Sequence, residues 1–292
     1  MVNEYRKTTK EEFRHPIMDQ VMPVIAFEGR NGLVAGTCVL IAPYLALTAR
    51  HVVEAIHRYF GCDAWKDKNA KLDVYPIQFN TGRIWYVSQV FAWIGTDIAF
   101  LRLQPRSEQA KTPASQFLKM TVDPPAIGSE ITASGYPKTE ITVERNDHEV
   151  TALKLNIYPT VSTGIVTEIH RSLRDKTMLN FPAFSVNARF PAGMSGGAVF
   201  NDKKELCGLV CSGLEDGQDR NGDYSNAVSI WPSMIIKMEF NSGDYLPSGL
   251  EPNRQYSALK LAQLGCIKVL GHERIEFFKH ENGSDGVRRK HF

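Results

Sequence analysis

Short apolar segments recur along most of the chain. They are rich in Val, Ile, Thr and aromatic residues and are bounded by Gly, Pro, Asn or Asp, a pattern that predicts β-strands. In the first part of the chain, strands are expected from Val24, Val34 and Tyr44 and over 71–79, 83–93 and 97–103.

A polar segment that begins at Pro105, PRSEQAKTPAS, separates this series from a second one and is interpreted as a linker. The second series is expected over 130–137, 160–169, 181–190, 196–201, 205–213 and 224–231. Two sets of about six short strands on either side of one polar connection favour barrels or sandwiches.

Helical patterns are few. A turn or two is expected after His51, in VVEAIHRYF, with further segments near PSMIIKMEF and in YSALKLAQL, after Asn253. The fold class is therefore expected to be all-β, with short helices and a C-terminal extension that contains a helix and a strand.

Charge and length exclude several kinds of partner. The 292 residues carry a formal net charge of +2, which gives no electrostatic signature for nucleic acid. The first residues mix charges of both signs, and no apolar run approaches the roughly 18 residues needed to cross a membrane. Neither a nucleic acid nor a membrane is expected as a partner.

Cysteine usage predicts the compartment. The five cysteines are an odd number without a framework spacing, which is typical of reduced thiols in a cytoplasmic protein. Cys207 and Cys211 fall on one face of a predicted strand, where small core residues are the simpler interpretation and a metal site the less favoured one. No cofactor is expected.

The segment GMSGG, from Gly193 to Gly197, is the first candidate for chemistry. It also satisfies G-x-S-x-G, the nucleophile elbow of α/β-hydrolases, which requires a helix directly after the serine and both triad partners downstream of it. Glycines at 196 and 197, followed by two strands, do not allow that helix. The elbow is therefore rejected.

Two other polar residues stand at the ends of predicted strands. His51 follows LALTAR, and Asp97 opens DIAFLRL. A lone histidine is more often structural, and an Asp beside Gly and Thr often forms a turn. Taken together with Ser195, and in the order His51, Asp97, Ser195 along the chain, they are interpreted as a candidate catalytic triad.

The blocks TARHVV, TDIAFLRL and GMSGGAVF resemble the three signatures of the chymotrypsin-like (trypsin-like) serine proteases of the PA clan. The resemblance covers Val24 to Trp231. It implies a double barrel of two six-stranded Greek-key β-barrels, here 21–115 with His51 and Asp97 and 116–236 with Ser195. Residues 1–20 and 237–292 would be extensions at the two ends.

The same resemblance implies the roles of individual residues. Ser195 would be the nucleophile, His51 its general base and Asp97 the carboxylate that orients the histidine. The N–H groups of Gly193 and Ser195 would form the oxyanion hole. A further block, CGLVCSG, resembles the strand that pairs with the substrate, so Cys211, Ser212 and Gly213 would bind the peptide backbone.

Several positions depart from the secreted members of the family. Met194 stands where those enzymes carry the Asp that accepts a newly cleaved N-terminus, and Val52 replaces a cysteine that often follows the histidine. The chain resembles bacterial intracellular or HtrA/Deg-type peptidases more closely. About 60 residues follow Trp231, too few for a PDZ domain.

Three further sites in the chain carry basic residues. Arg189 would lie at the floor of the specificity pocket and favour acidic side chains, the alternative being an exposed, solvated arginine. The terminal RRKHF is expected to be a solvated tail, and His170 a surface residue in a charged loop.

Two functions from different classes follow. The first is a serine endopeptidase that forms an acyl-enzyme, a regulated cytoplasmic processing protease with a protein or peptide substrate and an activating protein partner. The alternative is a non-catalytic or latent module that keeps the protease fold and binds peptides without cleaving them.

Overall fold

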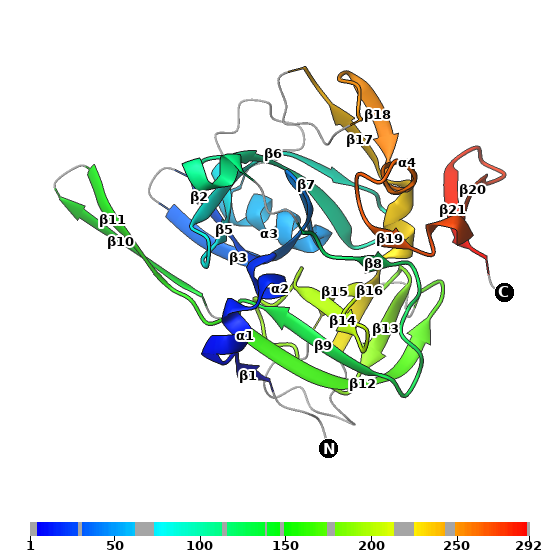
Figure 1. Cartoon of the computed structure of the whole chain (residues 1–292), viewed down its shortest axis with the longest axis horizontal. Helices are drawn as coiled ribbons and strands as arrows, with labels where there is room; N and C mark the ends of the chain where they lie inside the picture. Colours follow the sequence, from blue (N-terminus) through cyan, green and yellow to red (C-terminus); the bar gives the residue numbers. More distant parts are fainter. Residues whose placement is uncertain are drawn as a thin grey trace.

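Two closed antiparallel barrels hold most of the strands (Figure 1). The computed structural model describes residues 5–28, 31–61, 73–112, 116–137, 139–146, 149–173, 179–212, 225–242 and 249–290. The prediction of an all-β fold with two six-stranded barrels is confirmed.

The first barrel closes in the order β2-β3-β4-β7-β6-β5. Its strands are β2 (Val21–Glu28), β3 (Asn31–Ala42), β4 (Leu45–Ala49), β5 (Asp73–Gln78), β6 (Arg83–Ala92) and β7 (Ile98–Pro105). Met22, Leu40, Trp85 and Leu101 belong to its buried interior. Because side chains alternate across each strand, the apolar residues of all six strands can meet inside one closed sheet.

The second barrel runs β14-β9-β12-β13-β16-β15 and closes through the β14–β15 pairing. Its strands are β9 (Glu130–Gly135), β12 (Thr160–His170), β13 (Ala183–Val186), β14 (Ala198–Asn201), β15 (Leu206–Ser212) and β16 (Ser225–Ser229). Each of them falls in a segment where the apolar pattern predicts a strand.

Cys207 and Cys211 are both buried on β15. They do not share one face, because the register between β14 and β15 shifts at Cys207, between the Phe200↔Leu206 and Val199↔Gly208 pairs. Cys207 packs inside the second barrel, whereas Cys211 joins another apolar cluster. The four described cysteines are free thiols, and Cys62 lies outside the described residues.

The helix after His51 is longer than the expected turn or two. Helix α3 (Arg50–Phe60) has 11 residues and buries Val52, Val53 and Ile56 against the first barrel. The predicted helix near 232–240 is wrong beyond Ile235, where a 3-10 turn, η2 (Trp231–Ile235), gives way to β17 (Lys237–Phe240). No helix among the described residues has the length and apolarity to cross a membrane.

A two-stranded hairpin that the sequence pattern does not predict projects from the body of the molecule (Figure 1). It consists of β10 (Glu140–Asn146) and β11 (Glu149–Asn156), which pair from Glu140↔Asn156 outward. The sequence here mixes charged and apolar residues without a turn signal as clear as Asn-Gly, so periodicity alone does not identify it.

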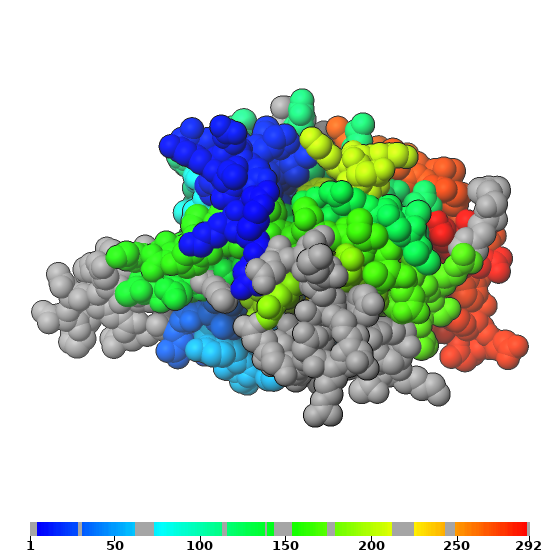
Figure 2. All heavy atoms as spheres, turned by 90° about the horizontal axis from the view of Figure 1, so that it is seen from below, coloured from blue at the N-terminus to red at the C-terminus, as the bar shows by residue number. Residues whose placement is uncertain are grey.

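The N-terminal segment lies along the second barrel before it enters the first (Figure 2). Strand β1 (Arg6–Lys7) pairs with β12, and two short helices follow, α1 (Lys10–Arg14) and α2 (Pro16–Asp19). Thr9 and Glu12 form a capping box at the start of α1.

The C-terminal extension contains more strands than expected. It continues after β17 through β18 (Arg254–Ser257), α4 (Ala258–Gln263), β19 (Val269–Leu270), η3 (His272–Arg274), β20 (Ile275–Lys279) and β21 (Asp285–Arg289). Strand β19 pairs with β8 (Met120–Thr121), which also pairs with β15 of the second barrel. The expected solvated tail is wrong for Arg288 and Arg289, which are part of β21.

A third apolar cluster joins these parts. It contains residues of the first barrel such as Phe100, of the second barrel such as Leu209, and of the extension such as Leu261. The C-terminal extension is therefore built into the same core as the barrels.

The segment after Pro105, which the sequence predicts to be a linker, also packs against the protein. Its 3-10 turn η1 (Glu108–Lys111) buries Ala110 in the apolar cluster of the first barrel.

A buried carboxylate lies where the N-terminal segment enters the first barrel. Asp19 Oδ2 accepts hydrogen bonds from Gln78 Nε2 at 3.2 Å and from Thr81 Oγ1 at 3.0 Å, and the Arg83 guanidinium lies 3.8 Å away. Its Oδ1 is buried without a hydrogen-bond partner in the described part of the chain. Burial raises the pKa of Asp19, and Thr81 and Arg83 offset only part of that rise.

The raised pKa of Asp19 makes stability depend on pH. We expect the free energy of unfolding to fall as the pH rises from the usual pKa of a carboxyl group through the raised pKa of Asp19, because ionisation is less favourable in the folded state than in the unfolded chain. Urea unfolding at a series of pH values measures this, and Asp19→Asn should remove that part of the pH dependence. Asp202→Asn, at an exposed turn, is the control; identical profiles for the wild type and Asp19→Asn would contradict the prediction.

Candidate active site

His51 and Asp97 meet at the end of the β4–β7 pair. Ala49 pairs with Ile98 in this sheet, so the first turn of α3 and the start of β7 lie next to each other. The His51 ring Nδ1 lies 2.7 Å from Asp97 Oδ2, and the His51 backbone N–H donates to Asp97 Oδ1 at 3.0 Å. The Arg50 N–H donates to the Asp97 carbonyl at 2.9 Å.

This arrangement fixes the histidine ring. Asp97 is 4% exposed, so its carboxylate is held away from water and directs both oxygens at His51. A carboxylate acceptor assigns the proton to Nδ1 and leaves Nε2 as the hydrogen-bond acceptor. The His51 side chain is 38% exposed, which allows that nitrogen to reach a substrate.

The GMSGG segment folds as two consecutive tight turns. The Met194 N–H donates to the Pro191 carbonyl at 3.1 Å, and the Gly197 N–H donates to the Met194 carbonyl at 2.8 Å. Gly193 and Gly196 occupy the third position of each turn with φ of 89° and 79°. These are type II turns, which need a positive φ at that position and therefore favour glycine. Ser195 is the second residue of the second turn.

Thr37 of β3 links this pair of turns to the first barrel. Its N–H donates to the Ser195 carbonyl at 2.8 Å, and its hydroxyl donates to the Gly193 carbonyl at 3.3 Å. The same hydroxyl accepts the Tyr136 N–H at 3.0 Å, and the Thr37 carbonyl accepts the Thr48 hydroxyl at 2.7 Å. Thr37 is fully buried, so one side chain and its backbone hold both carbonyls that flank the serine turn.

Close backbone contacts bring the serine turn to the histidine. A methyl group on Gly36 would lie 2.8 Å from both the Ser195 carbonyl oxygen and Val52 Cγ2, which follows His51 in the chain. A Cβ on Gly196 would lie 2.1 Å from the Thr37 carbonyl oxygen and 2.9 Å from the Ala49 nitrogen at the start of α3. No side chain larger than hydrogen fits at either glycine without moving the backbone.

The Ser195 side chain is half-buried, and its hydroxyl makes no hydrogen bond within the described residues, the His51 ring included. The N–H groups of Gly193 and Ser195 likewise have no acceptor in that part of the chain. Catalytic hydrogen bonds are often long without substrate and shorten when it binds. The structure thus brings His51 and Asp97 into contact and places the Ser195 turn against the same strand ends.

Met194 anchors the turn from the other side. It is fully buried in the cluster inside the second barrel, and its Cγ would lie 2.8 Å from a Cβ on Gly135. An apolar side chain thus occupies the position where the secreted enzymes that the sequence resembles carry a carboxylate. Packing inside the second barrel takes the place of an ion pair there.

The residues expected to bind substrate are only partly described. Arg189 is half-buried between two anchored neighbours: Asn187 Oδ1 accepts the Ile165 N–H at 2.6 Å, and the Phe190 N–H donates to Ser225 Oγ at 2.9 Å. Cys211 is 7% exposed, and its thiol donates to the Asn226 carbonyl at 3.3 Å. Ser212 ends β15, and Gly213 lies outside the described residues.

Thr37 holds the Ser195 turn by hydrogen bonds, and the sequence did not predict this contact. The signal was a threonine next to Gly36, inside an otherwise apolar strand, VAGTCVLI. A polar side chain in a buried strand must make hydrogen bonds, but the sequence around it does not identify the residues that it bonds to. The described residues contain no cluster of histidine, cysteine and acidic side chains that could hold a metal ion.

Solved protein structures with a similar arrangement have low sequence identity. Rv3671c from M. tuberculosis, in the inactive form of a serine-to-alanine mutant, gives a TM-score of 0.45 at 15% identity over 79% of this chain and 92% of its own. The HtrA-type protease AlgW with a decapeptide gives 0.49 at 15% identity over 73% of this chain and 61% of its own. A serine-to-alanine variant of AlgW with a tripeptide gives 0.47 at 17% identity, over 73% of this chain and 56% of its own.

Sequence comparison is more decisive. No curated protein matches the chain. The family described as "Trypsin-like peptidase domain" matches residues 36–209, which is more than half of the chain and contains Thr37, His51, Asp97 and Ser195. With the two closed barrels and the His51–Asp97 pair beside the serine turn, this match shows that the chain belongs to the trypsin-like peptidase family.

Proposed function

We propose that this chain is a serine endopeptidase in which His51, Asp97 and Ser195 form the catalytic triad. The observation that carries the proposal is the 2.7 Å contact between His51 Nδ1 and the buried Asp97 carboxylate, next to the double turn that presents Ser195. A histidine held in this tautomer has a free acceptor nitrogen, which is what a serine hydroxyl needs in a general base.

The reaction would proceed in two halves. His51 Nε2 takes the proton of the Ser195 hydroxyl as the oxygen attacks the scissile carbonyl carbon, and the C=O π electrons move onto the carbonyl oxygen. The tetrahedral intermediate then collapses, His51 gives its proton to the leaving amine, and an acyl-enzyme remains. Water activated by His51 repeats the steps and releases Ser195. Asp97 stabilises the imidazolium that forms in each half.

The first type II turn supports the proposed oxyanion hole. Its central peptide joins Ala192 to Gly193, and the positive φ of Gly193 fixes the orientation of that peptide. We propose that the N–H groups of Gly193 and Ser195 bind the oxyanion, a role consistent with their having no acceptor among the described residues. Cys211, Ser212 and Gly213 would pair with the peptide backbone of the substrate.

The boundaries of the functional units, the cellular compartment and the activating partner are proposed from the sequence. We propose functional units at 1–20, 21–115, 116–236 and 237–292, and a cytoplasmic processing role in which a protein partner activates the enzyme. Met194 supports an activation that does not use a new N-terminus, because a buried methionine offers no charge for an amino group to pair with. A peptidase of this kind would need no cofactor.

A latent peptide-binding module is the second candidate function. The observation that favours it is the Ser195 hydroxyl, which is not hydrogen-bonded to His51 in this conformation. Such a protein would recognise peptides at the same site without cleaving them. Activity of the serine itself distinguishes the two functions.

Labelling with a fluorophosphonate probe tests the nucleophile. We expect covalent labelling of the wild type, none of Ser195→Ala, and a rate about 10⁴-fold lower in Asp97→Asn, because an amide in place of the carboxylate leaves His51 in the wrong tautomer. Gel fluorescence or intact mass measures the labelling. No labelling of the wild type, with or without peptide ligands, would favour the latent module.

Thr37 offers a test of how the oxyanion hole is held. Thr37→Val keeps the shape of the side chain but removes the hydroxyl that bonds the Gly193 carbonyl. We expect kcat for peptide hydrolysis to fall about 10- to 100-fold with little change in KM, since small misplacements of catalytic groups have effects of this size. Thr37→Ser retains the hydroxyl and should restore most of the rate.

The control for Thr37 separates positioning from stability. Thr160 is also buried, and its hydroxyl donates to the Tyr158 carbonyl and not to a carbonyl of the Ser195 turn. Thr160→Val should lower the free energy of unfolding to a similar extent and leave kcat unchanged. Equal losses of kcat in Thr37→Val and Thr160→Val, or no rescue by Thr37→Ser, would argue against a positioning role.

Substrate preference is the third test. We propose that Arg189 favours an acidic residue on the acyl side of the cleaved bond through charge pairing. A positional peptide library should show cleavage after Asp or Glu in the wild type and a loss of that preference in Arg189→Gln. Preferred cleavage after large apolar or basic residues would refute this assignment.

A further inference from the structure

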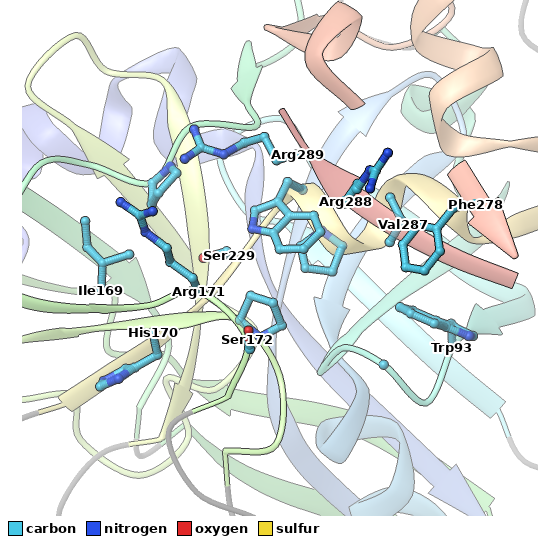
Figure 3. Close-up of a pocket in the computed structure, with 15 residues that line it drawn as sticks. Trp93, Ile169, His170, Arg171, Ser172, Ser229, Phe278, Val287, Arg288 and Arg289 are labelled. Carbon is cyan, nitrogen blue, oxygen red and sulfur yellow. The ribbon is translucent and has the colours of Figure 1, made fainter. Parts of the chain in front are cut away.

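A pocket of about 520 Å³ lies between the two barrels and the C-terminal extension, and it is not part of the catalytic centre described above. Its walls come from the loop before Asp97, from the end of β12, from η2 and from the β20–β21 hairpin (Figure 3). Volumes of this size accommodate small molecules.

Aromatic rings form a large part of the wall. Trp93, Trp231 and Phe278 all line the pocket, each from a different part of the chain. The Trp93 ring folds over Gly95, where a Cβ would lie 2.2 Å from its carbons. Flat rings of this kind favour a ligand with a planar, unsaturated group.

Arginines supply the polar part. Arg171, Arg288 and Arg289 line the pocket, and no Asp or Glu is found among the described residues that do so. In the view of Figure 3, Arg171 and Arg289 come from different elements on one side of the hollow, with Trp93 and Phe278 on the other. Guanidinium groups bind carboxylates and phosphates through several hydrogen bonds at once.

The acidic residues around the pocket leave positive charge available. Glu276 binds Arg288 through Nε at 2.9 Å and Nη2 at 2.8 Å, which orients this side chain beside Phe278 and leaves Nη1 as a donor. Asp123 contacts both Arg289 and Arg274. Arg171 is exposed and has no carboxylate partner in the described part of the chain, so its charge is not neutralised there.

His170 closes one end of the pocket. The expectation that it lies at the surface is wrong: it is 8% exposed, because it is the last residue of β12 and is paired with Ala183 of β13. Its Nε2 lies 2.9 Å from Ser185 Oγ, and its Nδ1 lies 3.6 Å from Glu168. Ser185 and Glu168 hold the His170 ring in place. At this end of the pocket, the neighbouring Arg171 is therefore the residue that can bind an anion.

We propose that this pocket binds a small aromatic anion, a molecule with one flat ring system and one carboxylate or phosphate group. The ring would pack against Trp93 and Phe278, and the anionic group would bind Arg171 on the opposite side of the hollow. A bound ligand would contact the loop that leads into Asp97 and the C-terminal hairpin at the same time.

Binding is measured by isothermal titration calorimetry on the full chain carrying Ser195→Ala, which makes the result independent of peptidase activity. Two probes separate two sources of the same chemistry: adenosine monophosphate, a nucleotide, and 1-naphthoate, an aromatic carboxylate. Inorganic phosphate and 1-naphthol each carry half of the proposed ligand. We expect at least one whole probe to bind with a Kd about tenfold or more below those of the halves.

Two pocket variants and one matched control complete the experiment. Arg171→Gln, at an exposed position that should not affect folding, and Trp93→Leu are each expected to raise the Kd about tenfold, the effect of losing one charged or aromatic contact. Arg14→Gln removes an equally exposed arginine from α1, which is not part of the pocket, and should leave the Kd unchanged.

The outcomes decide the proposal. Saturable binding that is weakened by both pocket variants and retained in the control supports it. Absence of saturable binding of either whole probe, unchanged affinity in Arg171→Gln, or an equal loss in Arg14→Gln, which indicates non-specific attraction, would overturn it. None of these results bears on whether Ser195 is a nucleophile.

Discussion

The candidate active site depends on the contact between the Ser195 turn and the strand ends of the first barrel. Thr37 binds the carbonyls of Gly193 and Ser195, while Gly196 lies directly against the backbone at the start of α3. Because the β4–β7 pair ends next to His51 and Asp97, these backbone contacts also fix where the Ser195 turn lies relative to His51. A shift of either barrel would separate them, so the relative position of the two barrels is itself part of the site.

The C-terminal extension limits that kind of shift. It shares an apolar cluster with both barrels, and Arg102 of β7 donates from Nη1 to the Glu239 carbonyl of the extension at 2.9 Å. The aromatic pocket lined by Trp93, Trp231 and Phe278 lies where these three parts meet. A ligand there would be held by each of them, and it would lie beside the loop that ends at Asp97.

Much of this could be predicted because the signals are local. The twelve barrel strands follow short apolar segments that are bounded by Gly, Pro, Asn or Asp, and the order of His51, Asp97 and Ser195 identified the candidate triad. The β10–β11 hairpin was missed because charged and apolar residues are mixed along its sequence. Arg288 and Arg289 were expected to be solvated, since their partners Glu276 and Asp123 are distant in the chain or on another strand.

The sequence by itself determined the strands, the glycines that allow two consecutive type II turns, and the residue types needed for nucleophilic catalysis, because backbone propensity and positive φ are properties of a residue and its close neighbours. Only the tertiary structure decided that Thr37 holds the serine turn, that Asp97 is buried against His51, and that three arginines gather around an aromatic pocket. Such contacts join residues far apart in the chain. Their geometry follows from strand register and from how the barrels pack, and no short stretch of sequence contains that information.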